Sequence, residues 1–252
     1  MKVLLRIAFL GKAYCGYQVQ PNGVTVQQKL NEAAKALFGF DCDIVGCSRT
    51  DSGVHANEFC VTVTKKGENF LETSVPVEKI PQAMSFRLPE DISVLSAVAV
   101  EDSFHPRYDV KYKEYVYQIW NSTSRNPFLA DRSWHCPKRI DEEGFSNMQK
   151  AAEFLRGKHD FSSFMAADSK IKDAQRTVFE AEVTRDGDLI VFRVCADGFL
   201  YNMVRIFVGT LLDVAYKKIQ PEDIPTIIDS HNRKMAGSTA PPEGLFLNRV
   251  VY

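Results

Sequence analysis

The pattern of apolar positions in the first half of the chain predicts both strands and a helix. Residues 3–10 form a nearly continuous apolar run, which predicts a buried strand. Apolar residues then recur every three or four positions over 26–38, which predicts a helix with Thr25 and Gln28 as a capping box and Gly39 at its end. Runs rich in β-branched and aromatic residues predict further strands at 59–65, 92–100 and 113–120.

The second half of the chain repeats this mixture. Asp141 precedes an apolar stripe that predicts a helix ended by Gly157. Residues 177–184 and 189–195 predict a hairpin, because Arg-Asp-Gly-Asp between them is a turn sequence. The remaining expected elements are a helix over 200–215, a short helix after Pro221 and a last strand near 247–251.

Helices and strands are therefore mixed in both halves, which predicts an α+β fold of two similar lobes. The segment 121–137 contains Ser, Thr, Asn and Pro and is the expected connector. We accordingly place an N-terminal lobe at 1–120 and a C-terminal lobe at 121–252. A chain of 252 residues is long enough to bury a substantial core.

The composition narrows the function classes without choosing one. Hydrophobic residues make up 45% and charged residues 25%, which is typical of a globular protein. Because the formal net charge is −1, nucleic-acid binding would need local clustering of Lys and Arg. The N-terminal apolar run is too short to span a bilayer and lacks a cleavage site, so we expect a cytoplasmic protein with no membrane segment.

The cysteines and histidines give no sign of a metal site or of a disulfide framework. The six cysteines form no Cys-x-x-Cys pair, and none of the five histidines stands at metal-ligand spacing with another His or Cys. We therefore expect reduced, mostly buried thiols and no metal ion.

One loop combines a cation with a carboxylate, in the run Arg49-Thr50-Asp51-Ser52-Gly53-Val54-His55-Ala56. Asp-Ser-Gly by itself is a turn sequence in which Asp51 would bond to its own backbone. The alternative is a loop that carries a nucleophile or base beside a phosphate contact, with Arg49 as that contact. The pattern alone leaves both interpretations open.

Three further stretches carry polar or aromatic residues that a simple core would not require. Residues 104–108 (Phe-His-Pro-Arg-Tyr) lead to Lys111, Lys113, Tyr115 and Tyr117. These residues form either an ordinary edge strand, its cations paired with acids such as Asp109 and Glu114, or a surface for RNA phosphates and bases. Arg205, at the end of 197–205, interrupts an apolar helix, where an arginine either snorkels or pairs with a carboxylate. Residues 240–245 (Ala-Pro-Pro-Glu-Gly-Leu) predict an irregular loop.

These stretches together resemble, in order and over nearly the whole chain, the tRNA pseudouridine synthase A family. The motif nearest the reaction is Gly46-x-x-Arg49-Thr50-Asp51-Ser52-Gly53-Val54-His55-Ala56. The others are Tyr17-Gln18-x-Gln20-Pro21 with Thr25-Val26-Gln27, Leu88-Pro89-Glu90-Asp91-Ile92, Phe104-His105-x-Arg107, Tyr115-x-Tyr117, His159-Asp160-Phe161-Ser162-Ser163-Phe164, Asn202-Met203-Val204-Arg205 and Ala240-Pro241-Pro242-x-Gly244-Leu245. Tyr17 is a departure, since the family usually has another aromatic residue there.

The resemblance implies two α/β lobes whose mixed or antiparallel sheets join around a basic cleft, usually in a homodimer. Its substrate would be the anticodon arm of tRNA, where uridines 38 to 40 in tRNA numbering become pseudouridine without a cofactor or metal. Asp51 would be the catalytic carboxylate, Arg205 the cation that keeps it ionised and Tyr115 the ring that stacks on uracil. The expected substrate contacts, besides Tyr115, are Arg49, Arg107, Lys111, His55 and Gln18.

Three alternatives to this function remain. The chain could be a catalytically silent RNA-binding protein, since basic and aromatic surfaces on α/β lobes also serve binding alone. It could act on a small nucleoside, although it lacks a phosphate loop and a dinucleotide-binding glycine motif. It could also carry out the same reaction at other tRNA positions.

Overall fold

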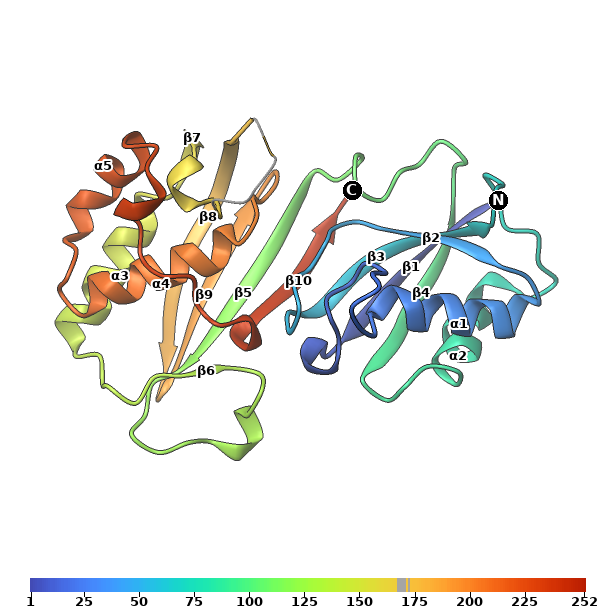
Figure 1. The fold of residues 1–252 in the computed structure, drawn as a ribbon, viewed down its shortest axis with the longest axis horizontal. Helices are drawn as coiled ribbons and strands as arrows, with labels where there is room; N and C mark the ends of the chain where they lie inside the picture. The colour runs from blue at the N-terminus through green and yellow to red at the C-terminus, as the bar shows by residue number, and fades with distance from the viewer. Residues whose placement is uncertain (167–170, 172) are drawn as a thin grey trace. The chain divides into compact units, whose positions relative to one another are not determined.

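The structure is a computed structural model that describes residues 1–166, 171 and 173–252 (Figure 1). The chain forms two compact units, which we call unit 1 (residues 1–111 and 246–252) and unit 2 (residues 112–245). The boundary drawn from the sequence, between residues 120 and 121, differs from this division at the strand 112–120 and at the C-terminal strand. Each unit combines helices with a sheet that has antiparallel and parallel pairs, as the α+β prediction requires.

The sheet of unit 1 is built around β3 (His55–Lys65). β1 (Lys2–Phe9) pairs antiparallel with β3 and with β4 (Ile92–Val100). β2 (Cys42–Gly46) pairs antiparallel with the end of β3, and β10 (Leu245–Val251) pairs parallel with its start. α1 (Val26–Phe38) contacts β2, and α2 (Ile80–Ser85) contacts β4.

α1 has the boundaries and the buried side that the sequence predicts. The Thr25 hydroxyl accepts the Gln28 N–H at 3.2 Å, and Gly39 ends the helix in the left-handed conformation with φ 81°. The predicted capping box forms only by half, because the Gln28 side chain donates to Glu32 instead of returning to Thr25. The residues of the predicted stripe that are buried are Val26, Leu30, Ala33 and Ala34, while Leu37 and Phe38 are half-buried.

The sheet of unit 2 has the antiparallel order β5-β9-β8-β7, and β6 pairs parallel with β5. Its strands are β5 (Tyr112–Trp120), β6 (Trp134–His135), β7 (Gly157–Asp160), β8 (Gln175–Asp186) and β9 (Leu189–Ala196). Its helices are α3 (Glu142–Glu153), α4 (Met203–Ala215) and α5 (Ile224–Asp229). The ring of Phe207 in α4 packs against Phe161, Phe164 and Phe192 and marks the core.

Most long predicted elements are confirmed, and the differences lie at ends and in short elements. Asp141 caps α3 as predicted, but the helix ends at Glu153, and Gly157, which has φ 114°, instead begins β7. The hairpin of β8 and β9 is confirmed, with Gly187 at φ 57° in its turn. The structure adds β2, α2, β6 and β7, which the sequence patterns did not predict. Within the described residues, no helix is long and apolar enough to cross a membrane.

Candidate active site

Asp51 lies in the loop of unit 1 that joins β2 to β3, and its side chain is half-buried. The loop turns tightly, since the Val54 N–H donates to the Asp51 carbonyl at 3.2 Å and Gly53 has φ 80°. Arg49, two residues earlier, is exposed. The turn predicted from Asp-Ser-Gly is therefore confirmed, and it presents a carboxylate and a cation from one short loop.

The segment that follows β1 holds this loop in place. The Tyr14 carbonyl accepts the Gly53 N–H at 3.4 Å, and the Tyr17 N–H donates to the Thr50 carbonyl at 3.2 Å. Gly16 has φ 79°, and a Cβ there would lie 2.5 Å from the Thr50 carbonyl oxygen. Only glycine fits that approach, so the motif around Tyr17 and the motif around Asp51 form one structural unit.

Asp91 extends the support to a third motif. The Tyr14 hydroxyl donates to the Asp91 carboxylate at 2.5 Å, and the Leu10 N–H donates to the Asp91 carbonyl at 2.9 Å. Burial and the neighbouring carboxylate raise the pKa of Tyr14 well above its usual value, so the phenol stays a donor. The motif Leu-Pro-Glu-Asp-Ile thus supports the Asp51 loop indirectly, because Asp91 holds Tyr14 and Tyr14 holds the loop. No pattern in the sequence indicates this role.

His55 and Gln18 lie in different surroundings. His55 is buried, its Nδ1 accepts the Gly11 N–H at 2.8 Å, and its ring stacks on Phe246 with centroids 4.6 Å apart. The structure therefore gives His55 a supporting place in the core of unit 1, whereas Gln18 is exposed beside the clamped Tyr17. The substrate contacts expected of both residues stay predictions.

The segment after β4 presents exposed cations. His105 and Tyr108 stack with ring centroids 4.2 Å apart, and the Asp109 carboxylate accepts the His105 N–H at 2.8 Å. Arg107 and Lys111 are exposed, and neither forms an ion pair with any residue that the structure describes. The alternative in which nearby acids such as Asp109 neutralise these cations therefore finds no support.

In unit 2, Arg205 is fixed at the start of α4. Its Nε donates to the Ala240 carbonyl at 2.7 Å, and its Nη1 donates to the Asn202 side-chain oxygen at 2.8 Å. The Ala240 N–H donates in turn to the Arg205 carbonyl at 3.0 Å. These bonds orient the guanidinium, and they explain why the motifs at 202–205 and 240–245 occur together.

Tyr115 and Tyr117 of β5 lie in different surroundings. Tyr115 is 6% exposed, and its ring meets Phe199 edge-on with centroids 4.9 Å apart. Tyr117 is fully buried, its hydroxyl donates to the Pro241 carbonyl at 2.7 Å, and a Cβ on Gly244 would lie 2.5 Å from its ring. Tyr117 therefore holds the 240–245 loop that orients Arg205, and the substrate contact expected of Tyr115 stays a prediction.

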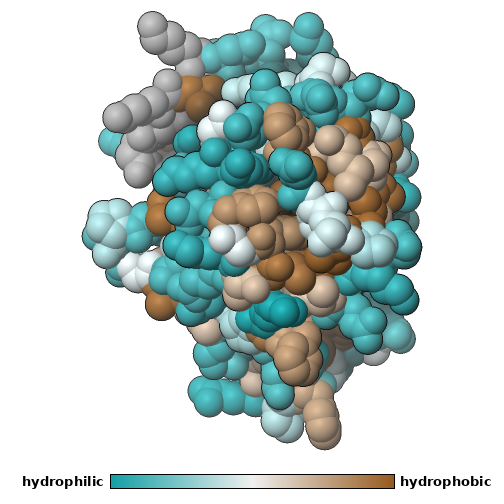
Figure 2. All heavy atoms as spheres, turned by 90° about the vertical axis from the view of Figure 1, so that its right-hand side faces the viewer, coloured by the Kyte–Doolittle hydropathy of each residue, from teal (hydrophilic) through white to brown (hydrophobic). Residues whose placement is uncertain are grey.

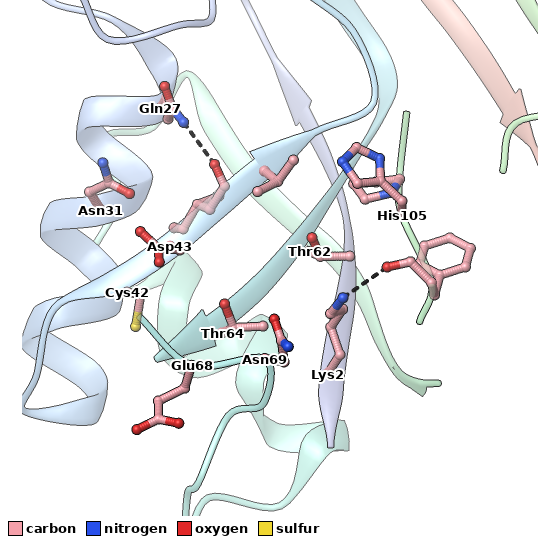
Figure 3. Close-up of a pocket in the computed structure, with 14 residues that line it drawn as sticks. Lys2, Gln27, Asn31, Cys42, Asp43, Thr62, Thr64, Glu68, Asn69 and His105 are labelled. Atoms are coloured by element: carbon pink, nitrogen blue, oxygen red, sulfur yellow. Dashed lines mark hydrogen bonds between the residues drawn. The ribbon is translucent and has the colours of Figure 1, made fainter. Parts of the chain in front are cut away.

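A polar pocket of about 410 Å³ opens elsewhere in unit 1, between α1, the strands β1 to β3 and residues 104–106 (Figure 3). Lys2 reaches across it and donates to the carbonyls of Asp102 and Phe104, while Gln27 donates to the Ile44 carbonyl. None of the site residues expected from the sequence lines it. The pocket is therefore not the place where those residues would act.

Two further sequence-based expectations concern the cysteines and metal ligands. Within the described residues, no disulfide joins the six cysteines, and five of them are buried. In the same part of the chain, no group of three or more His, Cys, Asp or Glu side chains could hold a metal ion. The expectation that the reaction needs no metal or cofactor stays a prediction.

Comparison with known proteins shows which family the chain resembles over its whole length. A family model described as tRNA pseudouridine synthase matches residues 151–252. The chain is 41% identical over 250 residues to tRNA pseudouridine synthase A of Caldicellulosiruptor bescii, and 42% identical over 253 residues to that of Thermoanaerobacter pseudethanolicus, with 99% of each chain covered in both cases. The protein of the same name from Bacillus licheniformis is 42% identical over 254 residues, covering 100% of this chain and 99% of the relative.

The fold, the motif loop and these matches together define the class, that of the tRNA pseudouridine synthases. Within that class, the chain belongs to the tRNA pseudouridine synthase A family. Among solved structures, a crystal structure of a Cbf5-Nop10-Gar1 complex is similar over 81% of this chain and 52% of that one, with 13% identity and a TM-score of 0.34. That likeness is too distant to bear on the argument.

Proposed function

We propose that the chain converts uridine to pseudouridine at positions 38 to 40 in the anticodon arm of tRNA, with Asp51 as the catalytic carboxylate. The observation that carries the proposal is full-length identity of 41% and 42% to proteins named tRNA pseudouridine synthase A. The clamped loop around Asp51 supports it, because catalysis requires reacting groups held in a fixed geometry. With tRNA as substrate, the protein would act in the cytoplasm.

The reaction is an isomerisation, so the protein has to hold and turn the base. The bond from uracil N1 to the sugar C1′ breaks, a bond from C5 to C1′ forms, C5 loses a proton and N1 gains one. An ionised carboxylate can attack C1′, attack C6 or remove a sugar proton, and Asp51 fits each route. No electrons enter or leave, and for this reason we expect no cofactor.

The other site residues would position the RNA around this step. We assign Tyr115 to stack on the uracil, with Phe199 fixing the angle of its ring. Arg49, Arg107 and Lys111 are exposed cations suited to backbone phosphates. Gln18 and His55 complete the expected contact set, His55 through the backbone that it supports. Extruding a paired uridine requires such contacts, since unstacking costs about a few kcal/mol.

Arg205 is proposed as the cation that keeps Asp51 ionised in a dry site. A nearby positive charge favours the ionised form of a carboxyl group. Replacing Arg205 with Ala should therefore move the acid limb of the kcat/KM profile to higher pH, and Arg205→Lys should move it less. If the limb stays where it is in both variants, Arg205 does not act on the ionisation of the carboxylate.

The direct test of the proposed function uses unmodified tRNA transcripts. After incubation with the protein, the RNA is treated with a carbodiimide that adds mass to pseudouridine, and mass spectrometry of the digest should find the adduct at positions 38 to 40. A matched transcript with cytidine at those positions should stay unmodified. Pseudouridine elsewhere would contradict the proposed positions. RNA binding without any pseudouridine would instead favour the silent RNA-binding alternative.

We also propose that the protein forms a homodimer through the β4 side of unit 1. β4 is an edge strand of nine residues without a charged side chain, and Leu95 and Val98 in it are exposed. Phe86, directly after α2, is exposed as well. Figure 2, which views the molecule from the right-hand side of Figure 1, shows apolar side chains gathered among hydrophilic ones. Uncovered apolar edge strands favour pairing with another chain.

Light scattering tests the proposed dimer. Leu95→Lys combined with Val98→Lys should halve the molar mass of the particle, because charges on the edge oppose association. Val24→Lys places the same charge on an exposed valine of unit 1 outside β4 and should leave the mass unchanged. A wild-type protein that scatters as a monomer at working concentration contradicts the proposal.

A further inference from the structure

Unit 2 carries a firmly held turn on the segment between β5 and α3, the yellow-green loop in Figure 1. The Asn126 side-chain oxygen accepts the Phe128 N–H at 3.0 Å, and the Leu129 N–H donates to the Asn126 carbonyl at 3.1 Å. Just before the turn, the Trp120 indole N–H donates to the Ser124 carbonyl at 2.8 Å. These bonds give the turn one conformation and make it a platform.

The platform presents an aromatic ring to solvent. Phe128 is 80% exposed, and folding gains nothing from a phenylalanine that stays in water. A 3-10 turn at Pro127–Leu129 holds the backbone on either side of the ring, so the exposure follows from the conformation of the turn. Such a ring on a preorganised turn is suited to a binding partner.

Arginines flank the ring. The segment 121–137 contains Arg125 and Arg132 and a single acid, Asp131, although the whole chain has a net charge of −1. Arg125 is exposed and, among the described residues, has neither an ion pair nor a hydrogen bond. Arg132 donates to the Phe128 carbonyl, so its charge is held at the backbone of the turn. An exposed aromatic ring between cations is the composition of an RNA contact.

We propose that the turn 125–132 is a tRNA contact outside the reacting centre, in which Phe128 stacks on an exposed base and Arg125 binds a backbone phosphate. RNA is favoured over a protein partner because the two arginines of the turn match a polyanion. The inference rests on the proposed tRNA substrate. It does not depend on which uridine is modified or on how Asp51 acts.

Phe128→Ala is the test, measured as the Kd for unmodified tRNA by filter binding at fixed salt. Stacking of one base on an aromatic side chain predicts a Kd about 5- to 100-fold weaker, with KM raised in parallel. Phe128→Trp keeps a ring that can stack and should restore binding. Phe179→Ala removes a phenylalanine that is 45% exposed in β8 beside Glu180, and it should leave the Kd unchanged.

The salt dependence of tRNA binding gives a second test of the same turn. Arg125→Ala should reduce the slope of log Kd against log salt by about one, because one phosphate is no longer neutralised. Wild-type affinity in Phe128→Ala overturns the proposal, and so does a change in molar mass by light scattering, since that would make the turn a protein contact. If wild-type protein makes no pseudouridine in tRNA, the proposed function fails. If it does and Phe128→Ala binds normally, only this inference fails.

Discussion

Tyr17 combines a well-packed ring with a hydroxyl group that has no partner. The ring stacks on Phe59 with centroids 4.4 Å apart, and a Cβ on Gly46 would come within 2.6 Å of it. The hydroxyl is buried without a hydrogen bond to any residue in the described part of the chain, and burial raises its pKa well above the usual value. An unsatisfied buried hydroxyl destabilises the folded state by about 1–3 kcal/mol.

Tyr17→Phe should therefore increase the free energy of unfolding by about 1 kcal/mol, because the unpaired hydroxyl is removed and the stacked ring is kept. Denaturant titration measures the change. Tyr117→Phe is the matched control, since it removes a hydroxyl that donates to Pro241, and it should lower stability by about 1 kcal/mol. Equal changes in the two variants would show that Tyr17 has a partner after all.

The second prediction at the residue scale concerns Asp51. Asp51→Asn keeps the shape of the side chain and removes its ability to act as nucleophile or base. Turnover should be abolished, while the Kd for tRNA stays within about tenfold of wild type, because one contact among many changes little. Pseudouridine formed by the purified variant, above what contaminating host enzyme produces, would refute the assignment.

At the scale of elements, the start of α4 is shaped around Arg205. Asn202 has φ 60° and ψ 8°, the left-handed conformation, and its side chain does not cap the backbone of the helix. It accepts instead from the Arg205 guanidinium, which the 240–245 loop holds from another direction. Strain of this kind costs about 1–3 kcal/mol and persists where function requires it.

Asn202→Gly separates the two roles of this residue. Glycine adopts positive φ without strain, so the fold should keep its stability while Arg205 loses one acceptor. We expect kcat to fall about tenfold with tRNA affinity unchanged, and Asn202→Asp, which keeps an acceptor oxygen, to retain more activity. Asn202→Ala should lose the same activity and in addition about 1 kcal/mol of stability. Wild-type kcat in Asn202→Gly would remove Asn202 from the positioning of Arg205.

Elements with a long, regular pattern could be predicted from the sequence, and short ones could not. α4 and β1 bury almost every apolar residue that their periods predict. β2 has only five residues, with Asp43 and Val45 exposed, and β7 reads Gly-Lys-His-Asp, so neither has a recognisable apolar face. α2 spans six residues, too few for a helical period.

In the candidate site, too, some residues could be predicted from the sequence and others could not. Asp51, Tyr115 and Arg205 stand out through their motifs, but the residues that hold them do not. Tyr14 and Asp91 lie 77 positions apart, and Arg205 and Ala240 lie 35 apart. A hydrogen bond between distant positions leaves no periodic pattern in a sequence, so only the folded chain reveals it.

For the whole molecule, the charge balance hides how charge is distributed. The 31 basic and 32 acidic residues nearly cancel. Many cations are paired with acids, such as Lys35 with Asp41 at 3.0 Å, whereas Arg107 and Lys111 are exposed without an ion pair in the described chain. RNA affinity depends on the phosphates that are contacted and not on net charge.

Binding to tRNA should therefore weaken steeply as salt rises, although the protein is nearly neutral. Arg107→Ala should lower affinity and reduce the salt slope by about one. Lys35→Ala removes a cation that is already paired and should leave the slope unchanged. A tRNA titration from low to moderate salt measures both, and an affinity that hardly responds to salt would end the RNA-binding interpretation of these cations.

The chain leaves unit 1 at residue 111 and returns to it only at residue 246. Phe246 and Leu247 then pair with His55 and Ala56, the first residues after the Asp51 turn. On the ribosome, all of unit 2 must be synthesised before this strand exists, a delay on the order of ten seconds at about 5–20 residues per second. Until then, the start of β3 lacks this parallel partner. A polypeptide released early, anywhere in unit 2, would lack the strand that pairs beside the Asp51 loop, so we expect unfinished copies not to modify RNA.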